Sequence, residues 1–338
     1  MTFVFTTGYS GFLMTEISVE SICECIQEDL EKVEKSLQLI LQSPVELVTQ
    51  VASHIVNSGG KRLRPILCLL AARAFGFVSA SCVRFACVCE FIHTATLLHD
   101  DVIDNATLRR GKESSNLLWG NKASVLVGDY LYCKASVLIA EEGDFRVLDI
   151  IAKTTETTTE GEVLEIIKSN DLDLKEEDYL EVVRCKTACL IAASCEIGAH
   201  LGGGSREDQE RLRLYGLNIG YAFQLADDAL DYISSNDDLG KLVGTDLKEG
   251  KVTLPLIHTL RHCSKEEKKV IVDCLETHSD QALAQVLKII DKYQGIEYTR
   301  QQAQLFIERA LEQISPLENH SAKRSLQNLA QYIIDRRN

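Results

Sequence analysis

Apolar residues recur every three or four positions along most of this chain, as at Leu30, Val33, Leu37, Ile40 and Leu41. This spacing places them on one face of an α-helix. Only 4 prolines and 20 glycines interrupt the 338 residues, so the predicted helices are long. The pattern therefore predicts an all-α protein built as a bundle of many helices.

The breaks in this pattern divide the chain into elements. Helices are predicted over residues 16–57, 66–75, 82–103, 124–141, 146–168 and 205–232, with amphipathic helices from Pro255 to the C-terminus. Ser58-Gly59-Gly60 predicts a turn, and Ser205 with Asp208 has the spacing of a capping box. No repeat or low-complexity segment divides the chain, so residues 14–338 are expected to form a single domain.

The charge balance restricts the partners of this protein. Fifty acids against 36 bases give a formal net charge of −14, which argues against nucleic acid as a partner. An anionic ligand must therefore be met by local basic residues or by a metal ion. No run of 18 apolar residues occurs, so no transmembrane segment is predicted.

The N-terminus and the cysteines favour a cytoplasmic protein. Residues 1–13 contain no charged residue, so they have neither the basic start of a signal peptide nor the arginines of a transit peptide. They are expected to be a disordered extension, or to precede a true start at Met14. The 12 cysteines form no CxxC pair and are expected to be reduced thiols in the core.

Two acidic clusters with the pattern DDxxD are the main chemical signal in the sequence. They comprise Asp100, Asp101 and Asp104, then Asp227, Asp228 and Asp231. Within a helix, positions i, i+1 and i+4 lie at 0°, about 100° and about 40°, so each triplet occupies one sector. A single cluster is more often a solvated helix face, but two with apolar flanks favour magnesium bridged to phosphate.

Basic and amide residues near these clusters are suited to binding phosphate. Lys61 and Arg64 follow the predicted glycine turn, and Arg109 and Arg110 follow the first cluster. His93 lies seven residues before Asp100, about 20° away on the helical wheel. A lone histidine is more often a core residue. Gln224, three residues before the second cluster, is placed to donate a hydrogen bond to phosphate.

The motifs, in this order and at this spacing, resemble the trans-isoprenyl diphosphate synthase (polyprenyl synthetase) family. They are residues 59–65 (GGKRLRP), 98–104 (LHDDVID), 109–111 (RRG), 119–121 (WGN), 128–129 (GD), 186–187 (KT), 223–228 (FQLADD) and 250–255 (GKVTLP). The resemblance covers residues 44–255. It implies the isoprenoid synthase fold, a single large helical bundle around a central cavity, and a family homodimer.

The resemblance also implies roles for particular residues. The metal site, expected to hold three Mg²⁺ ions with substrate bound, would comprise Asp100, Asp101, Asp104, Asp227, Asp228 and Asp231. Isopentenyl diphosphate would be held by Lys61, Arg64, His93 and Arg110. The allylic diphosphate would be held by Arg109, Lys186, Thr187, Gln224 and Lys241. The residues with direct catalytic roles would be Asp100, Asp104, Arg109, Lys186 and Asp227.

The length of the product is predicted from the residues just before the first cluster. Short-chain members of the family carry bulky aromatics there, whereas this chain has Ala95 and Thr96. Small residues favour a long all-trans polyprenyl diphosphate, of the kind that supplies quinone side chains. Its release is expected to involve transient contact with a membrane. The alternatives are a geranylgeranyl or farnesyl diphosphate synthase, a class I terpene synthase, or a non-catalytic subunit of a heteromeric synthase. The second aspartate triplet disfavours the terpene synthase, and the retention of both motifs disfavours the non-catalytic subunit.

Overall fold

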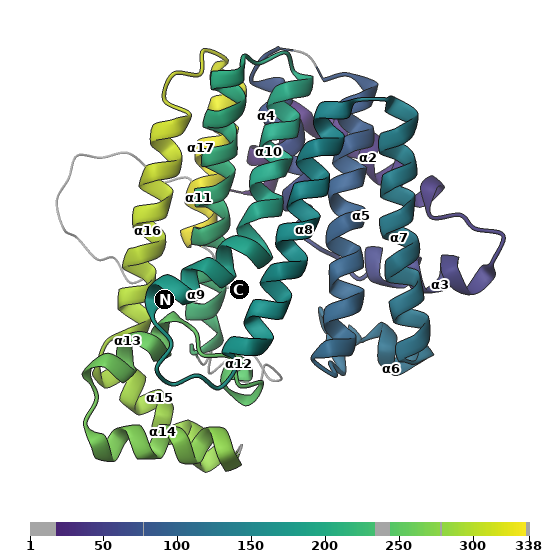
Figure 1. Ribbon diagram of the computed structural model, residues 1–338. Coiled ribbons are helices and arrows are strands. Elements are labelled where there is room, and N and C mark those ends of the chain that lie inside the picture. The colour runs from purple at the N-terminus through teal and green to yellow at the C-terminus, as the bar shows by residue number, and fades with distance from the viewer. Residues whose placement is uncertain (1–17, 77, 234–243, 278, 336–338) are drawn as a thin grey trace, which may run out of the picture.

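The computed structural model describes residues 18–76, 78–233, 244–277 and 279–335, and these are almost entirely helical (Figure 1). The N-terminal half contains α1 (Val19–Cys23), the 3-10 turn η1 (Glu24–Ile26), α2 (Gln27–Ile40), α3 (Glu46–Val56), α4 (Leu63–Arg73), α5 (Ala80–Ile103), β1 (Leu108–Arg109), β2 (Lys112–Glu113), α6 (Ser115–Trp119), α7 (Asn121–Glu142) and α8 (Phe145–Lys168). The fold confirms the predicted all-α class.

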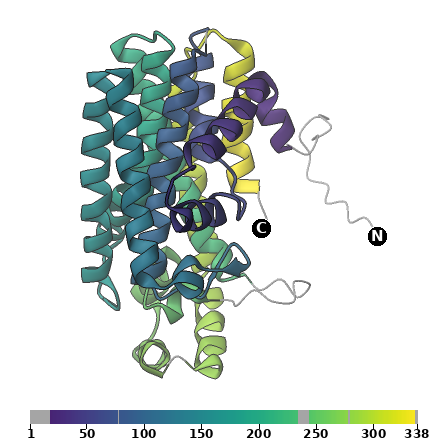
Figure 2. The ribbon, with the colours of Figure 1, turned by 90° about the vertical axis from the view of Figure 1, so that its right-hand side faces the viewer.

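The C-terminal half continues the bundle, then forms a helical hairpin, and ends in two long helices. It contains α9 (Glu176–Val183), the π-helical turn η2 (Arg184–Ala188), α10 (Cys189–Leu201), α11 (Arg206–Asp231), α12 (Thr245–Lys248), α13 (Leu254–His262), α14 (Lys265–Thr277), α15 (Asp280–Lys292), α16 (Gly295–Gln313) and α17 (His320–Asp335). The hairpin of α14 and α15 projects from the lower end of the bundle in both views (Figure 2).

The long helices run side by side, and their contacts define the bundle. α11 packs against α10 and α16, α10 packs against α4, and α5 packs against α4 and α7. α2 lies against α5, so the N-terminal helices cover one side of the bundle (Figure 2). Apolar residues buried by these contacts form one connected core cluster. α5 and α11, which contain the two aspartate clusters, both end at the lower end of the bundle in Figure 1.

Glycines allow α10 and α11 to approach their neighbours closely. A Cβ atom built on Gly198 of α10 would lie 2.1 Å from the carbonyl oxygen of Cys68 on α4. A Cβ atom built on Gly220 of α11 would lie 2.4 Å from the Cα of Ala188 in η2. These glycines set the spacing of α10 from α4 and of α11 from η2, because any larger residue would push these elements apart.

The predicted boundaries were correct for the long helices but wrong near the N-terminus. The expected helix over residues 16–57 is divided into α1, η1, α2 and α3. Pro44 lies between α2 and α3, where it provides no backbone N–H and restricts the residue before it. The capping box is confirmed: the Ser205 side chain accepts from the backbone N–H of Asp208, and the Asp208 side chain accepts from that of Ser205.

The small hairpin of β1 and β2 was not predicted. Arg110 (φ 54°) and Gly111 (φ 74°) form its two-residue turn, both with positive φ. This is the conformation that two-residue hairpin turns require, and glycine tolerates it better than arginine. The hairpin follows directly from the first aspartate cluster, so it positions Arg109 and Arg110 beside that cluster.

Two helices, α5 and α7, are long and apolar enough to cross a membrane by length and composition. The prediction from uninterrupted apolar runs did not find them. In α5, 72% of the apolar window is buried inside the bundle, as expected for a core helix. In α7 the buried share is 39%, so this helix keeps an exposed apolar side. All 12 cysteines lie in the described residues and are free thiols.

Candidate active site

The first aspartate cluster lies at the C-terminal end of α5. The Oδ1 atom of Asp100 is buried and has no hydrogen-bond partner. Burial raises the pKa of Asp100 to about 6, against the opposing charges of Lys186 and Arg109. A buried carboxylate oxygen without a donor is suited to a cation, so Asp100 fits the predicted metal site.

Asp101 has different surroundings from Asp100, although the two are adjacent. It is fully buried, and Arg109 donates to its Oδ1 atom from Nε at 2.7 Å and from Nη2 at 2.5 Å. Its Oδ2 atom is buried without a partner. This ion pair anchors the guanidinium of Arg109 beside the cluster, and the role of Asp101 as a metal ligand stays a prediction.

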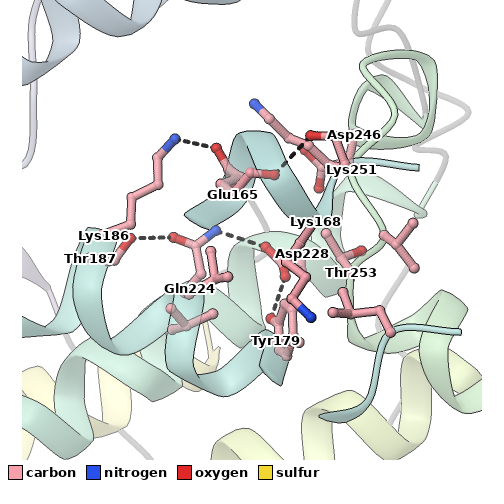
Figure 3. Close-up of a pocket in the computed structure, with 15 residues that line it drawn as sticks. Glu165, Lys168, Tyr179, Lys186, Thr187, Gln224, Asp228, Asp246, Lys251 and Thr253 are labelled. Atoms are coloured by element: carbon pink, nitrogen blue, oxygen red, sulfur yellow. Dashed lines mark hydrogen bonds and ion pairs between the residues drawn. The ribbon is translucent and has the colours of Figure 1, made fainter. Parts of the chain in front are cut away.

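The second cluster lies at the C-terminal end of α11 and is held by a hydrogen-bonded chain (Figure 3). Asp228 is buried and accepts from the Tyr179 hydroxyl at 2.5 Å and from Nε2 of Gln224 at 2.8 Å. Thr187 donates in turn to Oε1 of Gln224 at 2.9 Å. Burial raises the pKa of Asp228 to about 7, although both hydrogen bonds oppose the shift. Asp231 accepts from the backbone N–H groups of Thr245 and Asp246 at 3.2 and 3.1 Å.

Two lysines form ion pairs with acidic side chains near the hydrogen-bonded residues of the second cluster. The Nζ atom of Lys186 lies 2.5 Å from Glu165 (Figure 3). It also lies 2.8 Å from Glu162, and both glutamates are on α8. Lys251 lies 3.2 Å from Asp104 of the first cluster and 2.8 Å from Glu249. Lys186, Thr187, Gln224, Asp228 and Lys251 all line one cavity of about 140 Å³. The structure therefore brings three of the predicted allylic residues together, Lys186, Thr187 and Gln224, whereas Arg109 is not in the lining and pairs with Asp101. Lys251 links this cavity to the first cluster.

Several residues of this cavity were missed by the sequence analysis. They are Glu165, Tyr179, Asp246 and Lys251 in its lining, together with Glu162, which lies outside the lining and pairs with Lys186. Lys251 was part of a quoted motif without a role. The two glutamates lie three residues apart on α8, a helix that was predicted without a functional role. Their one signal was the adjacent Gly161: a Cβ atom built there would lie 2.7 Å from the backbone nitrogen of Lys186, so the glycine allows α8 to pack closely against η2.

A second cavity, of about 400 Å³, collects the other set of predicted basic residues. It is lined by Lys61, Arg64, His93 and Arg110, together with Asp227 from the second cluster. Arg110 donates to the carbonyl oxygen of Gly59, which fixes the hairpin turn against the glycine loop. Burial and the nearby arginines hold the pKa of His93 well below its usual range, so the imidazole is neutral. Arg62 also lines this cavity, so it combines four cationic side chains and one neutral ring with two acids, a surplus of positive charge that suits an anion.

The remaining predicted residues have different outcomes. Ala95 is buried, and Thr96 is half-buried with its hydroxyl donating to the carbonyl oxygen of His93 at 2.8 Å. Their role in chain length stays a prediction. Lys241 lies outside the described residues.

The carboxylates fit a divalent cation that keeps much of its own coordination shell. Within the described ranges, no three His, Cys, Asp or Glu side chains converge into a closed ligand set. A cation here would therefore take a few oxygens from Asp100, Asp104 and Asp227, and the rest from water and a diphosphate. Such a site needs a phosphate-bearing ligand to be complete.

Comparison with known proteins agrees with this geometry. The model of the family described as "Polyprenyl synthetase" matches residues 45–293. The octaprenyl diphosphate synthase of Escherichia coli (strain K12) is 39% identical, over 95% of this chain and 99% of that protein. An all-trans-nonaprenyl-diphosphate synthase (geranyl-diphosphate specific) of Rhodobacter capsulatus is 36% identical, over 94% of this chain and 98% of its own length. A polyprenyl synthase of Caulobacter crescentus CB15, solved with calcium and isoprenyl diphosphate, superposes with a TM-score of 0.91 at 37% identity, covering 95% and 98% of the two chains.

Proposed function

We propose, from the premise that this chain belongs to the polyprenyl synthetase family and is a prenyltransferase, that it makes a long-chain all-trans polyprenyl diphosphate. The substrates proposed are isopentenyl diphosphate and an allylic diphosphate such as farnesyl diphosphate. The observation that supports this assignment best is the presence of two separate cavities, each lined by several lysine or arginine side chains, beside two carboxylate clusters. Two diphosphate substrates require two such cavities.

Each cavity suits one substrate. In our assignment, Lys61, Arg64, His93 and Arg110 hold isopentenyl diphosphate, because their cavity has no metal-type cluster of its own beyond Asp227. Lys186, Thr187 and Gln224 hold the allylic diphosphate, next to the first cluster through the Lys251–Asp104 pair.

The reaction follows from the charges around the allylic diphosphate. Its C–O bond breaks, and the bonding electrons leave with the diphosphate. Mg²⁺ held by Asp100, Asp104 and Asp227 would neutralise the charge that develops there. Arg109 and Lys186 supply preorganised positive charge to the same oxygens. The double bond of isopentenyl diphosphate then attacks the allylic carbon. The released diphosphate accepts the proton whose loss restores a double bond in the lengthened chain. We assign no side-chain base.

The proposed product is long because the residues before the first cluster are small. Ala95 and Thr96 leave room for a growing tail, and the octaprenyl and nonaprenyl synthases named above are similar over nearly the whole chain. A geranylgeranyl or farnesyl diphosphate synthase is the alternative. It would require a bulky residue deeper in the tail pocket than Thr96.

We also propose that the protein is a homodimer through the outer side of α6, α7 and α8. The exposed large apolar residues on these helices are Leu117, Leu118, Val125, Leu126, Tyr132, Val137, Phe145, Leu148, Val163, Ile166 and Ile167. An apolar surface of this extent favours a protein partner over water. In a solution of the pure protein, every other molecule is a copy of this chain with the same apolar surface. A second copy is therefore the proposed partner.

The deciding experiment measures the products directly. Purified protein is incubated with Mg²⁺, farnesyl diphosphate and radiolabelled isopentenyl diphosphate, and the dephosphorylated products are separated by length. Products well beyond four isoprene units, lost in both Asp100→Asn and Asp227→Asn, are the expected result. Products that stop at three or four units would favour the short-chain alternative. No incorporation would favour a non-catalytic subunit.

A further inference from the structure

Arg62 lies between two predicted diphosphate ligands, yet protein groups already bind its guanidinium. Nε donates to Oε1 of Glu34 at 2.6 Å, and Nη1 donates to Oε1 of Glu90 at 2.9 Å. Nη2 donates to Oε2 of Glu34 at 3.3 Å and to the carbonyl oxygen of Val56 at 3.0 Å. Since a guanidinium has five N–H donors, these four hydrogen bonds leave little capacity for a diphosphate.

The backbone of Arg62 needs this support. Its φ of 47° and ψ of 32° lie in the left-handed region, directly before the first residue of α4. An arginine in this conformation costs free energy unless its surroundings hold it there. The carbonyl oxygen of Arg62 accepts from the N–H of Ile66 at 2.9 Å, so the same residue begins the helix. The orientations of Lys61 and Arg64 on either side depend on this turn.

Glu90 is a buried acid at an unexpected place, the wall of the basic cavity. Its side chain is 4% exposed and lies one turn before His93 on α5. Burial lowers the pKa of Arg64 and of Arg110, and the charge of Glu90 is the largest influence that opposes this shift for both. A carboxylate beside an anion site repels the ligand, so its presence there needs a structural explanation.

We propose that the bridge from Glu34 through Arg62 to Glu90 positions Lys61 and Arg64 for isopentenyl diphosphate, and that Arg62 is a positioning residue and not a diphosphate ligand. The bridge connects α2, the turn before α4, and α5, three elements distant in sequence. This inference rests on the proposed function, because it names residues that support one of its two substrate sites.

The variant Glu90→Gln tests the inference through the sign of one kinetic change. If Arg62 were a ligand, the variant would remove a repelling charge and free a donor, so KM for isopentenyl diphosphate would fall. If the bridge positions the loop, KM for isopentenyl diphosphate rises by about tenfold or more, as small displacements of binding groups do. KM for farnesyl diphosphate stays within about twofold in this case, because the allylic cavity does not contact the bridge. An unchanged or lower KM for isopentenyl diphosphate would overturn the inference.

Two further variants keep the outcome decisive. Glu34→Gln removes the other acid of the bridge at its partly exposed end, where the side chain is 42% exposed, and is expected to fold. It should raise the same KM less strongly, and its effect should not add to that of Glu90→Gln. If Glu90→Gln does not fold, Glu34→Gln alone tests the inference: a rise in KM for isopentenyl diphosphate supports it, and an unchanged or lower KM overturns it. Glu31→Gln, an exposed acid on the same helix, is the matched control and should change nothing. Wild-type protein without any activity would refute the proposed function instead, before this comparison is made.

Discussion

Asp100 shows how a catalytic residue can be unfavourable for the fold that contains it. Its buried oxygen has no donor, and its pKa of about 6 means that its ionised form is held at a cost at neutral pH. We expect Asp100→Asn to lower kcat by at least about 100-fold, because a group that stabilises developing charge is lost. The same variant should raise the free energy of unfolding of the metal-free protein by about 1 to 3 kcal/mol.

Activity assays and thermal unfolding in a chelator measure the two effects on the same preparation. Glu160→Gln on the exposed side of α8 is the control and should alter neither. A variant that lost activity and stability together would contradict this account of Asp100.

The raised pKa values of Glu162 and Asp228 predict how the stability of the protein depends on pH. Burial raises the pKa of each to about 7, so in the folded state each binds a proton that the unfolded chain has released. Stability therefore falls as pH rises from about 5 through about 8, since the native state binds more protons over this range. Melting temperatures of the metal-free protein at several pH values should show this slope. Saturation with Mg²⁺ and inorganic diphosphate should reduce it, and an unchanged slope in their presence would count against cation binding here.

Sequence reasoning at the level of single residues succeeded where one helix decides the geometry. The helical wheel placed His93 on the side of Asp100, and His93 does line a cavity beside the clusters. It missed Glu162, Glu165 and Asp246, whose importance arises from contacts between helices distant in sequence. Only the packing of α8 against η2 brings Glu162 to Lys186.

At the level of elements, the packing of α10 against α4 leaves no space for a side chain at Gly198. We expect Gly198→Ala to destabilise the protein by about 1 to 3 kcal/mol, because its Cβ would overlap the backbone of Cys68 and the helices would have to separate. Denaturant unfolding measures this change. Ala140→Ser adds one atom at an exposed position of α7 and should have little effect. Unchanged stability of Gly198→Ala would mean that α10 moves without cost.

The elements that sequence predicted well are those with long apolar periods. α5, α7, α8 and α11 begin and end within a few residues of their expected bounds. The division of the N-terminal segment depended on Pro44, and the β1–β2 hairpin on an arginine in a conformation that glycine normally adopts. A period of 3.6 residues does not report such local exceptions, because each involves only one or two residues.

At the level of the whole molecule, the family and its fold were predictable because several motifs occur in order along the chain. The exposed apolar side of α7 was not, since a helix that is apolar on most sides looks the same in sequence whether its own bundle or a partner covers it. The bundle covers α5 but leaves much of α7 exposed. This exposed apolar side of α7 is part of the proposed dimer interface.

If a second copy covers the α6–α7–α8 side, one charge placed there should separate the copies. Leu126 is 67% exposed on α7, and Leu126→Glu should convert a protein of twice the monomer mass into a monomer in sedimentation velocity. Leu305, 43% exposed on α16, provides the matched control, because Leu305→Glu adds the same charge to a helix that is not part of the proposed interface and should leave the dimer intact. A wild-type protein that sediments as a monomer would contradict the homodimer. The apolar side of α7 would then need another partner, and co-sedimentation with lipid vesicles, lost in Leu126→Glu but kept in Leu305→Glu, would identify a membrane surface as that partner.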